Sequence, residues 1–103
     1  MLARIDPCRK LFAHRLYRHH CLFIGQSAVV KDLNILGRDI AKTIIVDNSI
    51  LSFAYNLSNG VPIASFFGQS WDRELPQLHM LLEDLRFWMT KGGDVRDRLV
   101  EVF

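Results

Sequence analysis

The sequence lacks the features that mark a membrane-spanning protein or a secreted, disulfide-bonded one. No apolar run approaches the roughly 18 residues that cross a bilayer, and the first residues lack the apolar segment of a signal peptide. The two cysteines, Cys8 and Cys21, have neither zinc-ribbon nor Cys-x-x-Cys spacing. No internal repeat, low-complexity stretch or interdomain linker is present. We therefore expect one soluble, intracellular domain whose cysteines are reduced packing residues.

The sequence also has little excess charge, because 13 basic residues face 11 acidic ones and leave a net charge of +2. This balance argues against a dedicated nucleic-acid binder. The charges are nevertheless divided along the chain. Residues 1–43 hold eight Lys or Arg and three Asp, whereas residues 44–103 hold five basic and eight acidic residues. A basic first part fits a phosphate-containing partner, and it also fits an ordinary solvated face, which is the commoner case.

Half of the 103 residues are hydrophobic, which is enough for a packed core. Alternating apolar and polar residues predict a short strand over residues 12–18, and a second extended run covers residues 21–24. The β-prone residues 28–31 lead into Asp32, a good N-cap for one helical turn over residues 33–36. The first part of the chain is therefore expected to contain short strands and one capped turn.

The second part of the chain predicts a β-α-β unit followed by two helices. Residues 43–46 and 61–67 are continuous β-prone runs, as in parallel strands covered on both faces, with a short helix over residues 50–55 between them. Leucines at three- and four-residue steps predict a helix over residues 72–89, with Asp72 as its N-cap. Asp94 is placed to cap a last short helix. The expected fold class is α/β with a parallel sheet.

Lys31 and the pair Asp47-Asn48 are the most informative polar residues, because each lies where a strand is expected to end. In open α/β sheets, ligands bind where the carboxyl ends of neighbouring strands converge. An Asp-Asn pair offers oxygen ligands of the kind that Mg²⁺ accepts, and a nearby lysine offers positive charge for phosphate oxygens. By spacing alone, a surface lysine and an ordinary turn remain the commoner explanation.

Several blocks of the sequence resemble, in one order, the second half of the FCP/SCP-type phosphatases, also called NLI-interacting-factor-like. After a first block over residues 12–21, the matching blocks are Val30-Lys31-Asp32-Leu33, Leu36-Gly37-Arg38-Asp39, Ile44-Ile45-Val46-Asp47-Asn48-Ser49 and Val61-Pro62-Ile63-Ala64-Ser65-Phe66-Phe67. The similarity runs from about residue 5 to residue 90. Enzymes of this family act on the RNA polymerase II carboxy-terminal domain and belong to the haloacid dehalogenase superfamily. The resemblance therefore implies a Rossmann-like fold with a parallel central sheet.

The resemblance also implies roles for four residues. Lys31 matches the lysine that neutralises charge on the nucleophile and on the transferring phosphoryl group. Asn48 matches a Mg²⁺ ligand, and Asp47 matches the acidic residue beside it that orients metal-bound water or the lysine. Arg18 matches an arginine that contacts substrate phosphate, across a loop one residue longer than in the family. The implied function is a Mg²⁺-dependent phosphoserine/phosphothreonine protein phosphatase that acts on a phosphorylated protein or peptide, in the nucleus rather than in the mitochondrion.

One motif of this family is missing. These enzymes attack phosphorus with the first Asp of an Asp-x-Asp-x-Thr motif, and no Asp-x-Asp occurs in this sequence. Asp32-Leu33-Asn34 has a similar outline but reads as a helix cap. We therefore expect residues 1–103 to be the C-terminal part of one phosphatase domain, truncated at an internal Met, without the nucleophile strand and inactive alone. The strand that ends at Asp47 would then have an exposed hydrophobic edge, which favours self-association.

Other functions and sites are also compatible with parts of the sequence. A non-catalytic branch of the family binds peptide in the mitochondrial presequence translocase, and a protein that truly starts at Met1 belongs to that class by default. A metal site is suggested by His14, His19, His20 and Cys21, but neighbouring residues on a strand point to opposite faces, which favours a structural role. Core packing is favoured over a binding patch for Trp71, Phe87, Trp88 and Met89.

Overall fold

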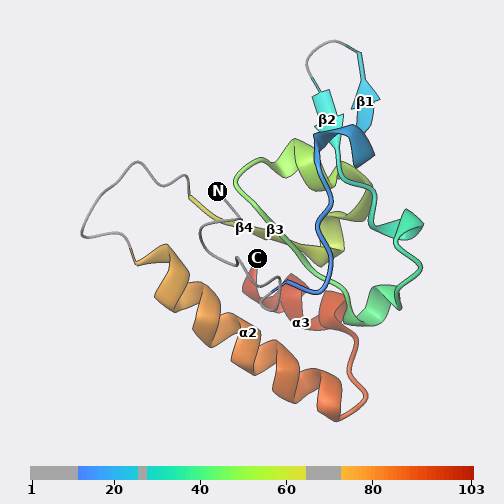
Figure 1. The fold of residues 1–103 in the computed structure, drawn as a ribbon. Helices are drawn as coiled ribbons and strands as arrows, with labels where there is room; N and C mark the ends of the chain where they lie inside the picture. The colour runs from blue at the N-terminus through green and yellow to red at the C-terminus, as the bar shows by residue number, and fades with distance from the viewer. Residues whose placement is uncertain (1–11, 26–27, 65–72) are drawn as a thin grey trace.

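The computed structural model describes residues 12–25, 28–64 and 73–103, which form a mixed α/β arrangement (Figure 1). In chain order the elements are the 3₁₀ helix η1 (Arg18–His20), β1 (Leu22–Ile24), β2 (Ala28–Val30), the 3₁₀ helices η2 (Leu33–Ile35) and η3 (Ile40–Lys42), β3 (Ile45–Asp47), the 3₁₀ helix η4 (Ile50–Asn59), β4 (Gly60–Pro62), and the α-helices α2 (Glu74–Thr90) and α3 (Val95–Val102). The strands form two separate pairs, β1 with β2 and β3 with β4.

β3 and β4 run parallel, as the sequence predicts for two β-prone runs joined by a crossover. Ile45 pairs with Gly60, and Asp47, the last residue of β3, pairs with Pro62. Part of the second expected strand, residues 65–67, lies outside the described residues. The parallel pairing agrees with the expected fold class, and it places the end of β3 beside the chain that leaves β4.

The crossover η4 differs from the regular short helix expected over residues 50–55. It is a ten-residue 3₁₀ segment with non-helical backbone at Phe53 and Asn56. The ring of Phe53 lies over Gly60, where a Cβ atom would overlap it. A short crossover must place its apolar side chains on the sheet within a few residues, so its backbone follows the packing of Phe53 rather than helix propensity.

β1 and β2 form an antiparallel hairpin in which Leu22 lies opposite Val30. This hairpin confirms the strand expected over residues 21–24. The strand expected over residues 12–18 is wrong, because that backbone enters no sheet and its last residue begins η1. An alternating pattern forms a strand only where a second strand is available for hydrogen bonding, and in the described part of the chain β1 and β2 pair only with each other.

Buried apolar side chains form two clusters, which pack different helices against the β3–β4 pair. The cluster among β4, α2 and α3 consists of Val61, Leu85, Val95 and Leu99. The cluster among η2, β3 and η4 consists of Leu33, Ile45 and Phe53. Close packing of this kind resists displacement of the backbone, so the residues at the end of β3 are held in fixed positions.

The two α-helices are joined by a tight turn in which Gly92 has a left-handed φ of 81°. As predicted, Asp94 caps α3, because its Oδ1 accepts a hydrogen bond from the Arg96 backbone N–H at 2.8 Å. Trp88 closes the turn by donating from Nε1 to the Asp94 carbonyl at 2.9 Å. The expected N-cap of the long helix, Asp72, lies outside the described residues.

The prediction of core packing for the aromatic residues near α2 is confirmed in part. Met89 packs against the first cluster, and Trp88 is fixed by its hydrogen bond. Phe87 contradicts the prediction, because it is 60% exposed and the Lys91 ammonium lies 4.4 Å from its ring centroid. Phe87 lies on the side of α2 that faces away from the core, and there the Lys91 ammonium packs against its ring. Trp71 lies outside the described residues.

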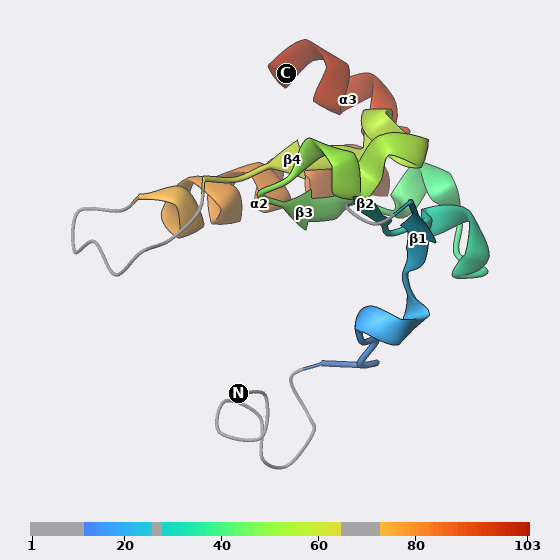
Figure 2. The same cartoon turned by 90° about the horizontal axis from the view of Figure 1, so that it is seen from above.

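Figure 1 places the β1–β2 hairpin and α3 on opposite sides of the β3–β4 pair, and Figure 2 shows α3 standing to one side of that pair. In the three described ranges, no helix has the length and apolar character needed to span a membrane.

Candidate functional site

Lys31 and Asp47 meet although they are 16 residues apart in the sequence. Lys31 directly follows β2, and Asp47 ends β3. The Lys31 Nζ donates to Asp47 Oδ2 at 2.6 Å, a short charge-assisted hydrogen bond. The Asp47 side chain is 8% exposed, whereas that of Lys31 is 49% exposed. The buried carboxylate therefore anchors an ammonium group that still faces solvent.

The Asp47 carboxylate is held on both of its oxygens. Oδ1 accepts a hydrogen bond from the Ser49 backbone N–H at 2.9 Å, and Oδ2 accepts from Lys31. Burial raises the pKa of this carboxyl, but the hydrogen bonds from Lys31 and Ser49 and the Lys31 charge outweigh burial, so its pKa lies below the usual value. Asp47 is therefore ionised at neutral pH and attracts the Lys31 ammonium.

The loop that carries Lys31 is fixed by residues of η4. The Lys31 backbone N–H donates to the Ser52 carbonyl at 2.7 Å, and the Leu33 N–H donates to Asn56 Oδ1 at 3.0 Å in a buried position. Asp32 caps η2 as predicted, accepting from the Asn34 N–H at 2.9 Å. Ser52 and Asn56 were not predicted from the sequence. No sequence signal marks Asn56, because η4 contains other polar residues as well, among them Ser58 and Asn59.

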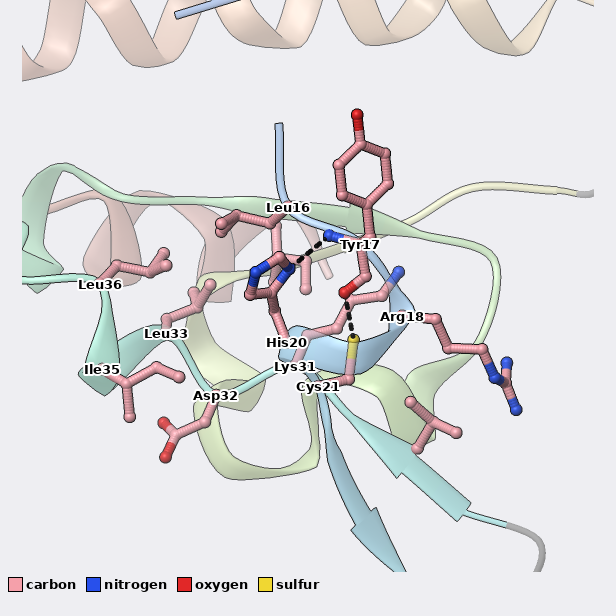
Figure 3. A pocket seen from close by; sticks show the side chains of 12 residues that line it. Leu16, Tyr17, Arg18, His20, Cys21, Lys31, Asp32, Leu33, Ile35 and Leu36 are labelled. Carbon is pink, nitrogen blue, oxygen red and sulfur yellow. Dashed lines mark hydrogen bonds between the residues drawn. The ribbon is translucent and has the colours of Figure 1, made fainter. Parts of the chain in front are cut away.

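A cavity of about 640 Å³ lies beside this loop, and both Arg18 and Lys31 line it (Figure 3). The remaining lining is largely apolar and includes Leu16, Leu33 and Leu36. The Arg18 guanidinium carbon lies 5.5 Å from the Phe23 ring centroid, so this side chain turns toward β1. The structure therefore brings Lys31 and Asp47 into contact and places Arg18 on the same cavity, in a different direction.

Asn48 follows Asp47 directly and is exposed, so its side chain is accessible at the end of β3. The two residues expected to bind magnesium, Asp47 and Asn48, are adjacent at the end of β3. Both oxygens of Asp47 already accept hydrogen bonds, and in the ranges that the structure describes no three His, Cys, Asp or Glu side chains gather around a possible ion. Mg²⁺ binds through one or two carboxylates and keeps several waters, and each oxygen of Asp47 retains a lone pair, so Asp47 and Asn48 fit part of such a site.

The histidine run forms a local structural contact. The Tyr17 backbone N–H donates to His20 Nδ1 at 2.8 Å, and the rings of His19 and His20 lie 4.0 Å apart between centroids. These residues lie on η1 and not on a strand, so the reason given above for separating them is wrong. The structural role expected for them agrees with the Tyr17 contact. Cys21 is a free, half-buried thiol whose Sγ lies 3.9 Å from the Tyr17 carbonyl oxygen.

The arrangement provides a fixed, half-exposed ammonium at the end of β3 and, beside the loop that follows β2, a partly apolar cavity that Arg18 also lines. Two cations in this position suit an anionic ligand. A family model described as NLI interacting factor-like phosphatase matches residues 1–96. The chain belongs to the NLI interacting factor-like phosphatase family. This membership confirms the resemblance seen in the sequence, and the mixed α/β fold is compatible with it.

Several of the similar curated proteins are named as small phosphatases. The chain is 47% identical over 95 residues to CTD small phosphatase-like protein 3 of Caenorhabditis elegans, covering 92% of this chain and 32% of that protein. It is 41% identical over 103 residues to CTD small phosphatase-like protein 2 of Dictyostelium discoideum, covering 100% of this chain and 17% of that protein. It is 43% identical over 81 residues to human carboxy-terminal domain RNA polymerase II polypeptide A small phosphatase 2, covering 79% of this chain and 29% of that protein. The chain therefore spans a third or less of the length of these relatives.

Proposed function

We propose that these residues form the charge-stabilising part of a phosphoserine/phosphothreonine protein phosphatase site. The contact between Lys31 and Asp47 carries this proposal, because it fixes a half-exposed ammonium group at the carboxyl end of β3. Family membership supports a phosphoprotein substrate. Phosphoryl transfer depends on positioning and on stabilising charge over the phosphoryl oxygens, and a fixed ammonium contributes to both.

Each residue has a separate task in this proposal. Lys31 donates hydrogen bonds to phosphate oxygens with the protons that Asp47 leaves available, since an ammonium carries three. Asp47 stays ionised and keeps Lys31 in one orientation, so less side-chain entropy is lost when phosphate binds. Arg18 contacts the phosphate after its guanidinium turns from Phe23 into the cavity that it already lines.

The nucleophile is proposed to come from outside these 103 residues. The sequence contains no Asp-x-Asp pair, and the relatives are at least about three times as long as the matched segment. Without an attacking carboxylate, the chain alone should bind phosphate but should not hydrolyse a phosphoester by the family mechanism. Nucleophilic catalysis needs a carboxylate aligned with phosphorus, which positive charge cannot replace.

Magnesium is likewise proposed only for the completed site. Asn48 and Asp47 would supply oxygen ligands, and further carboxylates would come from the segment that brings the nucleophile. When bound, the ion would neutralise charge on the phosphoryl oxygens. Asp47 is also proposed to orient metal-bound water or Lys31, to which it is hydrogen-bonded.

The direct test is binding of a phosphoserine peptide to the 103-residue chain, measured by isothermal titration calorimetry at neutral pH. Lys31→Ala should weaken binding by about tenfold or more, because a hydrogen bond to a charged group contributes about 1.5–3 kcal/mol. Lys42→Ala removes an exposed lysine of η3 and serves as the matched control. Equal loss in both variants, or no loss in Lys31→Ala, would contradict the assignment of Lys31.

A non-catalytic peptide-binding role is the second candidate, and the missing Asp-x-Asp pair favours it. The two candidates differ in a longer protein of this family that contains the matched segment. A phosphatase loses turnover by orders of magnitude on Lys31→Ala or Asn48→Ala while it stays folded. A binding protein shows no turnover before the change and none after it.

The names of the relatives suggest where the substrate is found. The human relative is named for the carboxy-terminal domain of RNA polymerase II polypeptide A. We extend this to the present chain as a proposal: its substrate is a phosphorylated protein in the nucleus. Nuclear accumulation of the tagged protein supports this proposal, and accumulation in the mitochondrion would contradict it.

A further inference from the structure

The β1–β2 hairpin exposes apolar side chains along its whole first strand. Leu22, Phe23 and Ile24 are 45%, 52% and 44% exposed. Among the residues that the structure describes, β1 is hydrogen-bonded to another strand on one edge only. A two-stranded hairpin is marginally stable by itself, and an open apolar edge is a template for another strand.

This hairpin begins and ends at the candidate site. Leu22 pairs with Val30, and Lys31 follows directly. Val29, which pairs with Phe23, lines the same cavity as Lys31. In Figure 1 the hairpin projects from the body of the molecule beyond this point. A peptide that brings a phosphate to Lys31 can continue past the base of the hairpin, and three of its residues in strand conformation span about 10 Å, the length of β1.

The charged and apolar side chains between Lys31 and β1 indicate what kind of ligand would bind there. Arg18 lies over the Phe23 ring and lines the cavity with Lys31, so two cations stand at the base of an apolar strand. A phosphate dianion matches the cations, and β-branched or aromatic side chains match the exposed face of β1. A ligand with both properties in one extended chain is a phosphopeptide with an apolar, strand-forming flank.

We propose that the open edge of β1 binds the substrate by strand addition: an extended phosphopeptide pairs its backbone with β1 while its phosphate contacts Lys31. This inference rests on the proposed function of the same site. In strand addition the backbone hydrogen bonds supply affinity, and alternate side chains supply selectivity. The preferred substrate therefore has two or three β-branched or aromatic residues directly beside the phosphorylated residue.

The test uses the 103-residue chain and peptides that carry one phosphoserine beside alternating valine and threonine residues, placed before it in one peptide and after it in another. In a strand added to β1, every second backbone N–H faces β1. N-methylation of the residues whose N–H faces β1 should weaken binding about 3- to 10-fold. N-methylation of the alternate residues, whose N–H groups face away from β1, should leave the affinity unchanged. Ile24→Ser should lower affinity for these peptides, whereas Val100→Ser, at an exposed position on α3, is the matched control.

The outcomes separate this inference from the proposed function. Equal affinities for the two N-methylated peptides, with loss of binding in Lys31→Ala, would overturn strand addition and leave the phosphate site intact. Unchanged peptide binding in Lys31→Ala would overturn the phosphate site itself. A dimer that Ile24→Ser abolishes, with no difference between the two sets of methylated residues, would show that a second copy occupies β1 and would also overturn strand addition.

Discussion

The contact between Lys31 and Asp47 can be measured as a coupling free energy of unfolding by a double-mutant cycle. Lys31→Met keeps the aliphatic stem, and Asp47→Asn keeps the shape of the carboxylate while removing its charge. The contact is short, at 2.6 Å, and the carboxylate is 8% exposed, but the ammonium is 49% exposed and partly screened by water. We therefore expect a coupling of about 1–2 kcal/mol, between the values for exposed ion pairs and for buried charged hydrogen bonds.

The pH dependence of this coupling follows from the lowered pKa of Asp47. A carboxyl whose pKa is lower in the folded state than in the unfolded state stabilises the fold fully above the unfolded pKa. That stabilisation is lost as the pH falls through the folded pKa. The coupling should therefore be constant near neutral pH and should decline once the pH falls below the ordinary value of 3.8. In Lys31→Met the Asp47 pKa should rise, because burial is then opposed by fewer favourable contacts.

Urea unfolding of the four proteins, followed by far-ultraviolet circular dichroism between pH 3 and pH 7, measures the coupling. The m-value of each variant checks that the same transition is being compared. A coupling near zero at pH 7, or one that stays the same after the carboxyl is protonated, would refute the account of how Asp47 holds Lys31.

Further predictions concern stability, metal binding and association. Leu85→Ala should lower the free energy of unfolding by about 3 kcal/mol, because Leu85 is 1% exposed, while Met80→Ala, at a 72% exposed position, should change it by less than about 0.5 kcal/mol in the same urea assay. Asp94→Ala should cost about 1 kcal/mol through loss of the cap of α3, and Asp94→Ser should recover most of it. Magnesium chloride at a few millimolar should leave the melting temperature of the 103-residue chain unchanged, because magnesium is proposed to bind only the completed site. A site with a Kd well below 1 mM would raise the melting temperature. Sedimentation velocity should show association that increases with concentration, because β3 pairs only with β4 in the described residues; a single monomeric species that melts cooperatively would contradict this.

The parts of the fold that depend on local pattern were predictable from the sequence. The β-branched run before Asp47, the leucine spacing in α2 and the cap at Asp94 each determine an element with little help from distant residues. The segment over residues 12–18 was not predictable in this way. Its alternating pattern requires a partner strand, and a partner strand is a property of the whole fold.

The sequence predicted that Lys31 and Asp47 lie close together, but it did not predict how the fold brings them there. Two strand ends were expected to converge, but β2 and β3 belong to separate pairs, and Lys31 reaches Asp47 because its backbone is hydrogen-bonded to Ser52 of η4. The contributions of Ser52 and Asn56 could not be read in the same way. Ser52 acts on Lys31 through its backbone carbonyl, which every residue has, and Asn56 acts through a buried amide whose partner depends on the kinked path of η4.

We propose above that Lys31, held by Asp47, forms a phosphate-binding site at the end of β3. The most direct measurement is a ¹H–¹⁵N NMR titration of the 103-residue chain with inorganic phosphate. We expect saturable shifts at the backbone amides of Lys31 and residues 47–49, absent in Lys31→Ala and preserved in Lys42→Ala. Shifts that spread along α2 and α3, or that persist unchanged in Lys31→Ala, would contradict it.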